Sequence, residues 1–269
     1  MSNFTIDLTK LSDKKILIAT PMYGGQCFGE FAHSVINLCS TFSSHKIKYD
    51  VYFIMGESLI TRARNFVCDY FMKNDFDYLI FIDADIKFKV DDILTLIYYA
   101  LEREDMKIIC GPYPKKEINW ESVKSAILAN NEEDSNNLQN FTSSYFINPL
   151  PGSEKILMSE PQKILYGGTG FMLIKREVFD IIRKKHTKRL YKNDHADVTT
   201  TDIMAYFDCI IDKKSKRYLS EDYMFCQTAK DLGIDTWLIP WLELTHIGTY
   251  YYKGSMANLG KLQNKNEIM

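Results

Sequence analysis

The stretch Tyr78-Leu-Ile-Phe-Ile-Asp-Ala-Asp85 joins a short apolar run to two carboxylates. Five residues of this character between polar segments predict a strand that is buried on both faces. Such strands occur in parallel sheets covered by helices, and these sheets bind ligands beyond the carboxyl ends of their strands. The stretch therefore predicts an α/β fold with Asp83 and Asp85 at its ligand-binding edge.

Similar apolar runs lie on both sides of this strand and alternate with amphipathic stretches. We expect strands at residues 15–20, 49–55 and 107–111, and helices at residues 30–40, 59–73 and 90–104. This alternation predicts a mostly parallel sheet with right-handed crossovers and helices on both faces.

The second half of the chain is less regular. The patterns predict two short strands within residues 163–175, helices at 176–185 and 220–232, and strands at 206–211 and 236–246. An Asn-, Glu- and Ser-rich stretch opens residues 130–160, where we expect a mobile loop, and residues 188–201 predict a surface loop.

The composition suits one sizeable core, because 46% of the 269 residues are hydrophobic, and we expect a single domain over residues 1–269. The 33 basic and 35 acidic residues give a net charge of −2, which argues against general affinity for nucleic acid or anionic membranes. There is neither a run of about 18 apolar residues nor a secretory pattern in residues 1–15, so we expect a cytoplasmic protein. The six cysteines lack C-x-x-C spacing, which favours reduced core thiols over a zinc site.

Asp83 and Asp85 offer hard oxygen ligands of the kind that Mg²⁺ or Mn²⁺ prefers. His246 follows the last predicted strand and would be a suitable third ligand through its neutral imidazole. Each feature has a plainer interpretation, since an Asp can cap a strand-end turn and a histidine can be a structural hydrogen-bonding group. A second pair, Asp75 and Asp77, precedes the strand and predicts a solvated turn.

Two further segments have the chemistry of anion sites. Arg62 and Arg64 open a predicted helix, where arginine opposes the helix dipole unless an anion lies nearby; a solvated basic turn is the alternative. Gly167-Gly-Thr-Gly170 would let backbone amides approach a ligand, although a tight hairpin explains the glycines equally well.

Ser220-Glu-Asp222 has the pattern of a helix start with acidic residues in its first turn. A capped helix needs no function, but Asp222 could also act as a general base for an acceptor hydroxyl while Glu221 orients that acceptor.

In combination, these motifs resemble a metal-dependent glycosyltransferase of the GT-A type, similar to glycosyltransferase-like proteins of phages, giant viruses and bacteria and to mannan-polymerase and collagen-galactosyltransferase domains. The motifs, in chain order, occupy residues 16–25, 62–65, 81–85, 111–116, 168–172, 220–223 and 246–248. The resemblance implies a GT-A, Rossmann-like α/β fold with a nucleotide-binding half at about 14–116 and an acceptor half at about 160–255.

The resemblance also implies a nucleotide-sugar donor, most readily a UDP-sugar, and Mn²⁺ or Mg²⁺ as cofactor. It assigns the metal to Asp83, Asp85 and His246. The expected donor-binding residues are Thr20, Pro21, Tyr23, Arg62, Asn65, Asp83, Ala84, Gly168, Thr169 and Gly170. An inverting enzyme would use Asp222 as base with Glu221 beside it, whereas in a retaining enzyme the donor phosphate would take the proton.

Three other classes of protein fit these residues less well. A nucleotidyltransferase would carry a basic residue in the loop at residues 21–27, which has none. An aspartyl phosphatase would carry Thr or Val where Lys87 stands. A catalytically inactive nucleotide-sugar-binding module would not need Asp222. The acceptor (glycan, protein or modified base) and homo-oligomerisation stay open.

Overall fold

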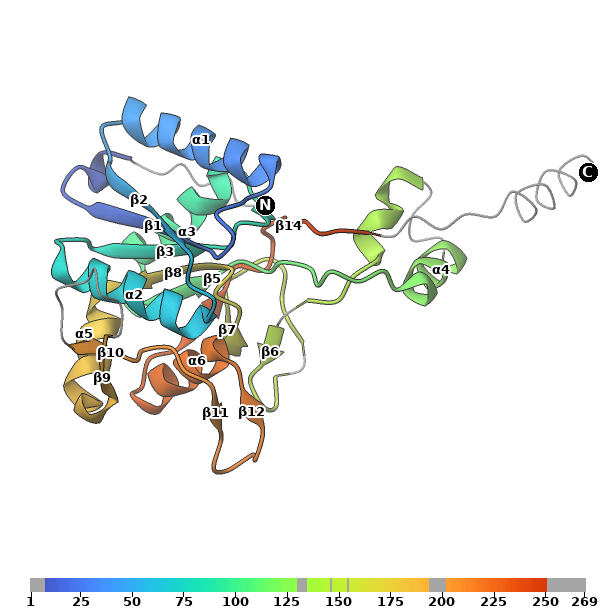
Figure 1. Ribbon diagram of the computed structural model, residues 1–269. Coiled ribbons are helices and arrows are strands. Elements are labelled where there is room, and N and C mark those ends of the chain that lie inside the picture. Colours follow the sequence, from blue (N-terminus) through green and yellow to red (C-terminus); the bar gives the residue numbers. More distant parts are fainter. Residues whose placement is uncertain (1–7, 130–134, 146, 154, 194–201, 251–269) are drawn as a thin grey trace, which may run out of the picture.

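The computed structural model describes residues 8–129, 135–145, 147–153, 155–193 and 202–250. Its centre is an eight-stranded sheet surrounded by helices (Figure 1). The strands lie in the order β2 (Lys48–Met55), β1 (Lys15–Met22), β3 (Tyr78–Ile82), β8 (Phe171–Lys175), β5 (Ile108–Cys110), β13 (Thr236–Leu238), β7 (Gln162–Gly167) and β6 (Ile147–Pro149). β7 and β8 run opposite to the other six strands, so the sheet is mixed but has one dominant direction.

Helices cover both faces of this sheet, and each face has its own apolar core. The helices of one face are α2 (Ile60–Lys73), α5 (Arg176–Lys185) and α6 (Glu221–Asp231), and those of the other are α1 (Gly29–Ser44) and α3 (Val90–Glu102). In β3 the side chains of Leu79 and Phe81 join the first core, and those of Ile80 and Ile82 join the second. Alternate residues of a strand face opposite sides, so burial on both sides explains the continuous apolar run. The predicted α/β class is confirmed.

Three two-stranded ladders and the remaining helices complete the described chain. The ladders are β4 (Ile86–Lys87) with β14 (Thr245–His246), β9 (Leu190–Lys192) with β10 (Asp202–Met204), and β11 (Ile210–Ile211) with β12 (Tyr218–Leu219). The other helices are η1 (Leu8–Leu11), α4 (Trp120–Leu128), η2 (Ser135–Phe141) and η3 (Thr187–Arg189). α4 and η2 lie to one side of the sheet and its covering helices (Figure 1). None of the helices in the described ranges is long and apolar enough to cross a bilayer.

The glycine-rich segment does not form a hairpin. β7 pairs with β13 and β6, whereas β8 lies between β3 and β5, so residues 168–170 carry the chain across the sheet. The hairpin alternative is therefore wrong, and the antiparallel β8 is the main departure from the predicted parallel order.

The strand expected at residues 206–211 is also wrong. β10 ends at Met204 and β11 begins at Ile210, and between them Tyr206 and Phe207 are buried. The side chain of Asn65 bonds both backbone groups of Phe207, its Nδ2 donating to the carbonyl and its Oδ1 accepting from the N–H, each at 2.9 Å. These bonds take the place of a neighbouring strand. Parts of the predicted loops, residues 130–134, 146, 154 and 194–201, lie outside the described residues.

Candidate functional site

The turn after β3 holds the acidic pair against the last strand of the described chain. The N–H of Asp83 donates to the carbonyl of Gly170 at 2.9 Å, so the start of the turn is fixed by β8. Beyond the turn, the β4–β14 ladder places Ile86 opposite His246. Because Asp85 directly precedes Ile86, the ladder brings the imidazole of His246 to the acidic pair.

In Asp85 and His246, two hydrogen-bond acceptor atoms point towards each other: Oδ2 of the carboxylate and Nε2 of the neutral imidazole. The Nδ1 of His246 lies 2.8 Å from the carbonyl oxygen of Pro114 and must donate to it, because a carbonyl can only accept. In the neutral imidazole the Nε2 lone pair then points at Asp85 Oδ2, 3.5 Å away. Two acceptors do not attract each other, so this arrangement requires a proton or another cation between them.

A lysine already supplies one cation to this carboxylate. The Nζ of Lys116 donates to the same Oδ2 of Asp85 at 2.5 Å. Burial acts to raise the pKa of Asp85, but the contacts from His246, when its Nε2 carries a proton, and from Lys116 outweigh it and lower the pKa to about 2. Asp85 is therefore a carboxylate at neutral pH.

Asp83 is paired with a buried arginine. The Nη2 of Arg64, on α2, lies 3.1 Å from Asp83 Oδ1, and its Nε lies 3.4 Å from Glu221 Oε1. Burial acts to lower the pKa of Arg64, but the two carboxylates outweigh it and raise the pKa, so the guanidinium stays charged. Its Nη1 is buried and has no hydrogen-bond partner among the described residues. A buried N–H left unbonded costs about 1–3 kcal/mol, which suggests that a ligand satisfies it.

Arg64 lines a cavity of about 620 Å³, which we call the Arg64 cavity. Its charged wall consists of Arg64, Glu221 and the acidic turn, and the other residues are largely apolar or uncharged. The full lining is Pro21, Gln26, Cys27, Phe28, Ile60, Arg64, Asp83, Ala84, Asp85 and Glu221. A cavity with one apolar wall and a few converging polar groups is the usual form of a small-molecule site.

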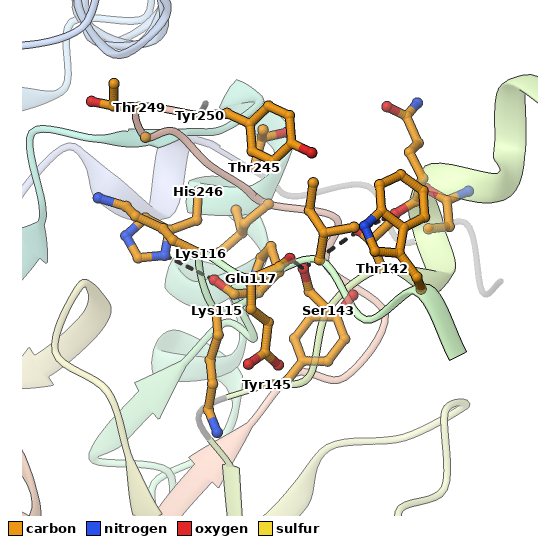
Figure 2. Close-up of a pocket in the computed structure, with 17 residues that line it drawn as sticks. Lys115, Lys116, Glu117, Thr142, Ser143, Tyr145, Thr245, His246, Thr249 and Tyr250 are labelled. Carbon is orange, nitrogen blue, oxygen red and sulfur yellow. Dashed lines mark hydrogen bonds between the residues drawn. The ribbon is translucent and has the colours of Figure 1, made fainter. Parts of the chain in front are cut away.

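A second cavity of about 630 Å³, the Trp120 cavity, has no lining residue in common with the first. His246 and Lys116 line this second cavity and both contact Asp85 (Figure 2). Its walls come from residues 114–120, residues 139–145 and residues 244–250, three segments that are far apart in the sequence.

The expected three-ligand metal set does not assemble in this structure. Asp83 forms an ion pair with Arg64, while Asp85 contacts His246 and Lys116. Across the part of the chain that the structure describes, no three His, Cys, Asp or Glu side chains are grouped closely enough to hold a metal ion. Asp85 and His246 do fit as two ligands of one ion, since their facing acceptor atoms lie 3.5 Å apart.

Arg62 and Asn65, which were expected to bind the nucleotide, bond to protein groups in this structure and do not line the Arg64 cavity. Arg62 forms a two-pronged ion pair with Glu57, with nitrogen–oxygen distances of 2.5 and 2.9 Å, and Glu57 is buried. This pair compensates the charge of Arg62 at the start of α2. Asn65 is also buried, and both atoms of its amide group bond the backbone of Phe207. Of the two arginines, Arg64 lines the cavity and Arg62 does not.

The glycine segment accommodates a protein side chain. A Cβ on Gly168 would lie 2.0 Å from the hydroxyl of Tyr113, and one on Gly170 would lie 2.9 Å from both that hydroxyl and Asp83 Oδ2. The missing side chains therefore make room for Tyr113, whose hydroxyl accepts from the N–H of Gly170 at 3.3 Å. Thr169 between them is buried. The segment does not present its amides to the Arg64 cavity.

The other expected donor residues divide between the cavity and its surroundings. Pro21 and Ala84 line the Arg64 cavity. Thr20 is fully buried at the end of β1, and its hydroxyl has no partner within the described ranges. Tyr23 is 66% exposed and does not line the cavity.

The acidic pair of α6 is split between two environments. Glu221 reaches the Arg64 cavity, while Asp222 does not line it. The hydroxyl of Ser220 donates to Asp222 Oδ1 instead of capping the helix, and the same oxygen accepts from the N–H of Tyr223 at 2.8 Å. Burial, followed by repulsion from Glu221, raises the pKa of Asp222. A raised pKa is common in a carboxylate that acts as a general base, but Asp222 lines neither the Arg64 cavity nor the Trp120 cavity.

Comparison with known proteins gave matches at the level of structure. No family model matches the sequence, and no curated protein does. Structures of similar fold include A197 from STIV, with 17% identity, 87% of this chain and 86% of that chain covered, and a TM-score of 0.49. GalNAc-T7 with UDP, GalNAc and Mn²⁺ aligns at 12% identity over 90% of this chain and 45% of its own, with a TM-score of 0.48.

A third structure, CMP:2-keto-3-deoxy-manno-octonic acid synthetase complexed with CTP, aligns at 11% identity over 94% of this chain and 99% of its own, with a TM-score of 0.39. This chain thus spans less than half the length of the GalNAc-T7 chain. With identities of 17% or less and TM-scores below 0.5, these alignments carry no argument about the chain.

Proposed function

We propose that the chain is a metal-dependent glycosyltransferase that moves a sugar from a nucleotide-sugar, most readily a UDP-sugar, to an acceptor hydroxyl. The observation that carries the proposal is that Asp85, which lines the Arg64 cavity, belongs to a pair that requires a cation, while the same cavity holds a buried, unbonded N–H donor suited to an anion. The pair is Asp85 with His246, and the donor is the unbonded Nη1 of Arg64.

Arg64 is suited to bind a phosphate oxygen. Its guanidinium is buried and fixed by Asp83 and Glu221, so little side-chain entropy is lost when Nη1 bonds to a ligand. A hydrogen bond from a charged donor to a phosphate is about twice as strong as a neutral one. The apolar residues Pro21 and Phe28 offer the same cavity a surface for a nucleobase.

The charge balance of the cavity explains why a divalent ion would accompany the nucleotide. Three carboxylates line it, and the cations that contact them are one guanidinium and one ammonium, which leaves a formal charge of −1. A diphosphate would add further negative charge at close range, where repulsion is large.

Asp85 and His246 Nε2 would hold that ion, since carboxylate oxygen and imidazole nitrogen are suitable ligands for it. When bound, the ion neutralises the charge that develops on the departing nucleoside diphosphate. The bond from His246 Nδ1–H to the Pro114 carbonyl keeps the imidazole in the tautomer that this role needs.

The chain's part in the chemistry is proton transfer, which we assign to Asp222. The acceptor oxygen forms a bond to the anomeric carbon, the carbon–oxygen bond to the diphosphate breaks, and its electron pair leaves with the nucleoside diphosphate. The hydroxyl proton goes to the carboxylate of Asp222, whose raised pKa suits a base. Glu221, between Asp222 and Arg64, would orient the reacting groups.

Product analysis tests the proposal. The full chain is incubated with UDP-, GDP- and CMP-linked sugars and Mn²⁺, with and without added pyrophosphate, and the products are identified by mass spectrometry. Cleavage at the sugar carbon releases the free nucleotide (a diphosphate from UDP- or GDP-sugars), which supports the proposal. Formation of nucleoside triphosphate from pyrophosphate and a nucleotide-sugar would instead identify a nucleotidyltransferase, and no turnover or nucleotide binding would indicate an inactive module or another class.

A further inference from the structure

We propose that the Trp120 cavity is the acceptor site, and that the acceptor is a neutral carbohydrate whose ring stacks on Trp120 and Tyr145. This inference rests on the proposed function, because the acceptor bound in the Trp120 cavity would be the second substrate of the proposed transfer reaction.

The wall of the cavity is fixed by backbone pairing. Pro114 and Tyr145 form an antiparallel bridge. The N–H of Lys115 donates to the carbonyl of Ser144 at 2.8 Å, and that of Asn119 donates to the carbonyl of Thr142 at 2.7 Å. These bonds hold residues 114–119 beside residues 142–145, so the side chains on both segments have defined positions.

Large aromatic side chains line this cavity and are accessible within it. Trp120 is 64% exposed, Tyr145 is 46% exposed and Tyr250 is 45% exposed. Exposed aromatic rings gathered in one hollow mark a binding surface. Their flat apolar faces fit the C–H face of a pyranose, while the indole N–H and phenol O–H can bond to its hydroxyls.

The polar lining matches an uncharged ligand. Amide and hydroxyl side chains dominate it, namely Gln139, Asn140, Thr142, Ser143, Thr245 and Thr249. The lysines and carboxylates of the lining are Lys115, Lys116 and Glu117, and Lys116 is paired with Asp85. A single-stranded nucleic acid also stacks on aromatic rings, but it needs a row of cations along its backbone. A neutral sugar therefore fits this lining better.

The position of the cavity suits an acceptor. His246 and Lys116 lie at one side of it and Thr142 at the opposite side (Figure 2). Asp85 lines the Arg64 cavity and contacts both His246 and Lys116. A sugar held on the aromatic rings would thus extend a hydroxyl towards His246 and Lys116, the two residues that link this cavity to Asp85 and the donor side.

Saturation-transfer NMR on the full chain tests the inference with a defined set of probes. These are the methyl α- and β-glycosides of glucose, galactose and mannose, with an eight-residue oligothymidylate as the rival ligand. We expect at least one glycoside to receive saturation from the aromatic resonances, and Trp120→Ala to reduce this transfer at least about fivefold. Leu128→Ala is the matched control, because Leu128 is on the same helix, 76% exposed, and outside the cavity lining.

UDP binding with Mn²⁺, measured on the same variants, separates this inference from the proposed function. If UDP binds the wild type but no glycoside shows Trp120-dependent transfer, the acceptor inference is overturned while the donor proposal stands. Trp120-dependent binding of the oligothymidylate alone would overturn the carbohydrate class. If glycosides bind through Trp120 but UDP does not bind, the carbohydrate site is supported and the glycosyltransferase proposal fails.

Discussion

The ammonium of Lys116 lies 2.5 Å from Oδ2 of Asp85, on the side of the carboxylate that faces His246. A divalent ion bound by Asp85 and His246 would compete with this ammonium, because like charges repel strongly at such distances. Lys116 therefore balances the charge of Asp85 in the free protein and would have to move away when an ion binds.

Replacing Lys116 with methionine should tighten metal binding. Lys116→Met keeps most of the apolar stem but removes the competing charge, so we expect the affinity for Mn²⁺ alone, measured by calorimetry, to rise at least about threefold. Lys115→Met is the matched control, since Lys115 lines the same cavity but is not the lysine on Asp85. A weaker affinity in Lys116→Met would show that Lys116 supports the ion rather than competing with it.

Asp222→Asn distinguishes a base from a structural residue. If Asp222 takes the acceptor proton, turnover should fall at least about a hundredfold while UDP affinity is kept. The stability cost should be at most about 1 kcal/mol, because the amide oxygen can still accept from Tyr223 N–H. The wild-type rate should also fall as the pH drops through the raised pKa of Asp222, since the protonated acid cannot act as a base.

Glu221→Gln serves as the comparison for that variant. Glu221 contacts Arg64 and lines the cavity, so its loss should weaken nucleotide binding as well as turnover. Unchanged turnover in Asp222→Asn would refute the base assignment and favour Glu221 or a retaining mechanism.

Asn65→Ala tests whether Asn65 stabilises the fold through Phe207 or binds the nucleotide, as the sequence predicted. The substitution leaves the N–H and the carbonyl of Phe207 without partners in the core, so the free energy of unfolding should fall by about 2–4 kcal/mol. Urea titration measures this loss. The affinity of the folded variant for UDP should stay within about twofold of wild type, and a large loss of affinity at unchanged stability would restore the original assignment.

The lowered pKa of Asp85 predicts a pH-dependent contribution to stability in the presence of EDTA. The folded-state pKa is about 2 and the ordinary value is 3.8, so the unfolded chain takes up the proton first as the pH falls. The contribution is complete above about pH 5 and is lost as the pH falls towards 2. Asp85→Asn should therefore be less stable than wild type at pH 7, by no more than about 2 kcal/mol. That difference should shrink between pH 4 and pH 3; a constant difference would contradict the ion pairing.

The sequence predicted the elements that depend on local patterns. The apolar run at residues 78–82 forms β3, and the amphipathic pattern at residues 176–185 forms α5 with the expected bounds. Both signals arise from which faces of a short segment are buried, and this is visible in the order of its own residues. The sequence suggested His246 as a partner of the acidic pair, but it did not predict the ladder that brings His246 to Asp85, since the pairing of β4 with β14 depends on distant segments.

The rest of the site depends on contacts that local patterns do not encode. Arg64 and Arg62 look alike in the sequence, and only their partners, Asp83 with Glu221 in one case and Glu57 in the other, separate their roles. The glycines at residues 168–170 suggested a ligand but make room for Tyr113, from a segment whose side chains had been given no role. The Trp120 cavity was missed because three separate segments form it.

The most direct test of the central claim is a calorimetric titration of UDP into the full chain, with Mn²⁺ and then with EDTA, for the wild type and Asp85→Asn. If an ion held by Asp85 and His246 binds the diphosphate, Mn²⁺ should tighten wild-type binding at least about tenfold, or about 1.4 kcal/mol. Asp85→Asn should lose most of this gain and retain the weaker, metal-free affinity that Arg64 supports. Equal UDP affinity with Mn²⁺ and with EDTA, or an undiminished gain in Asp85→Asn, would contradict the claim.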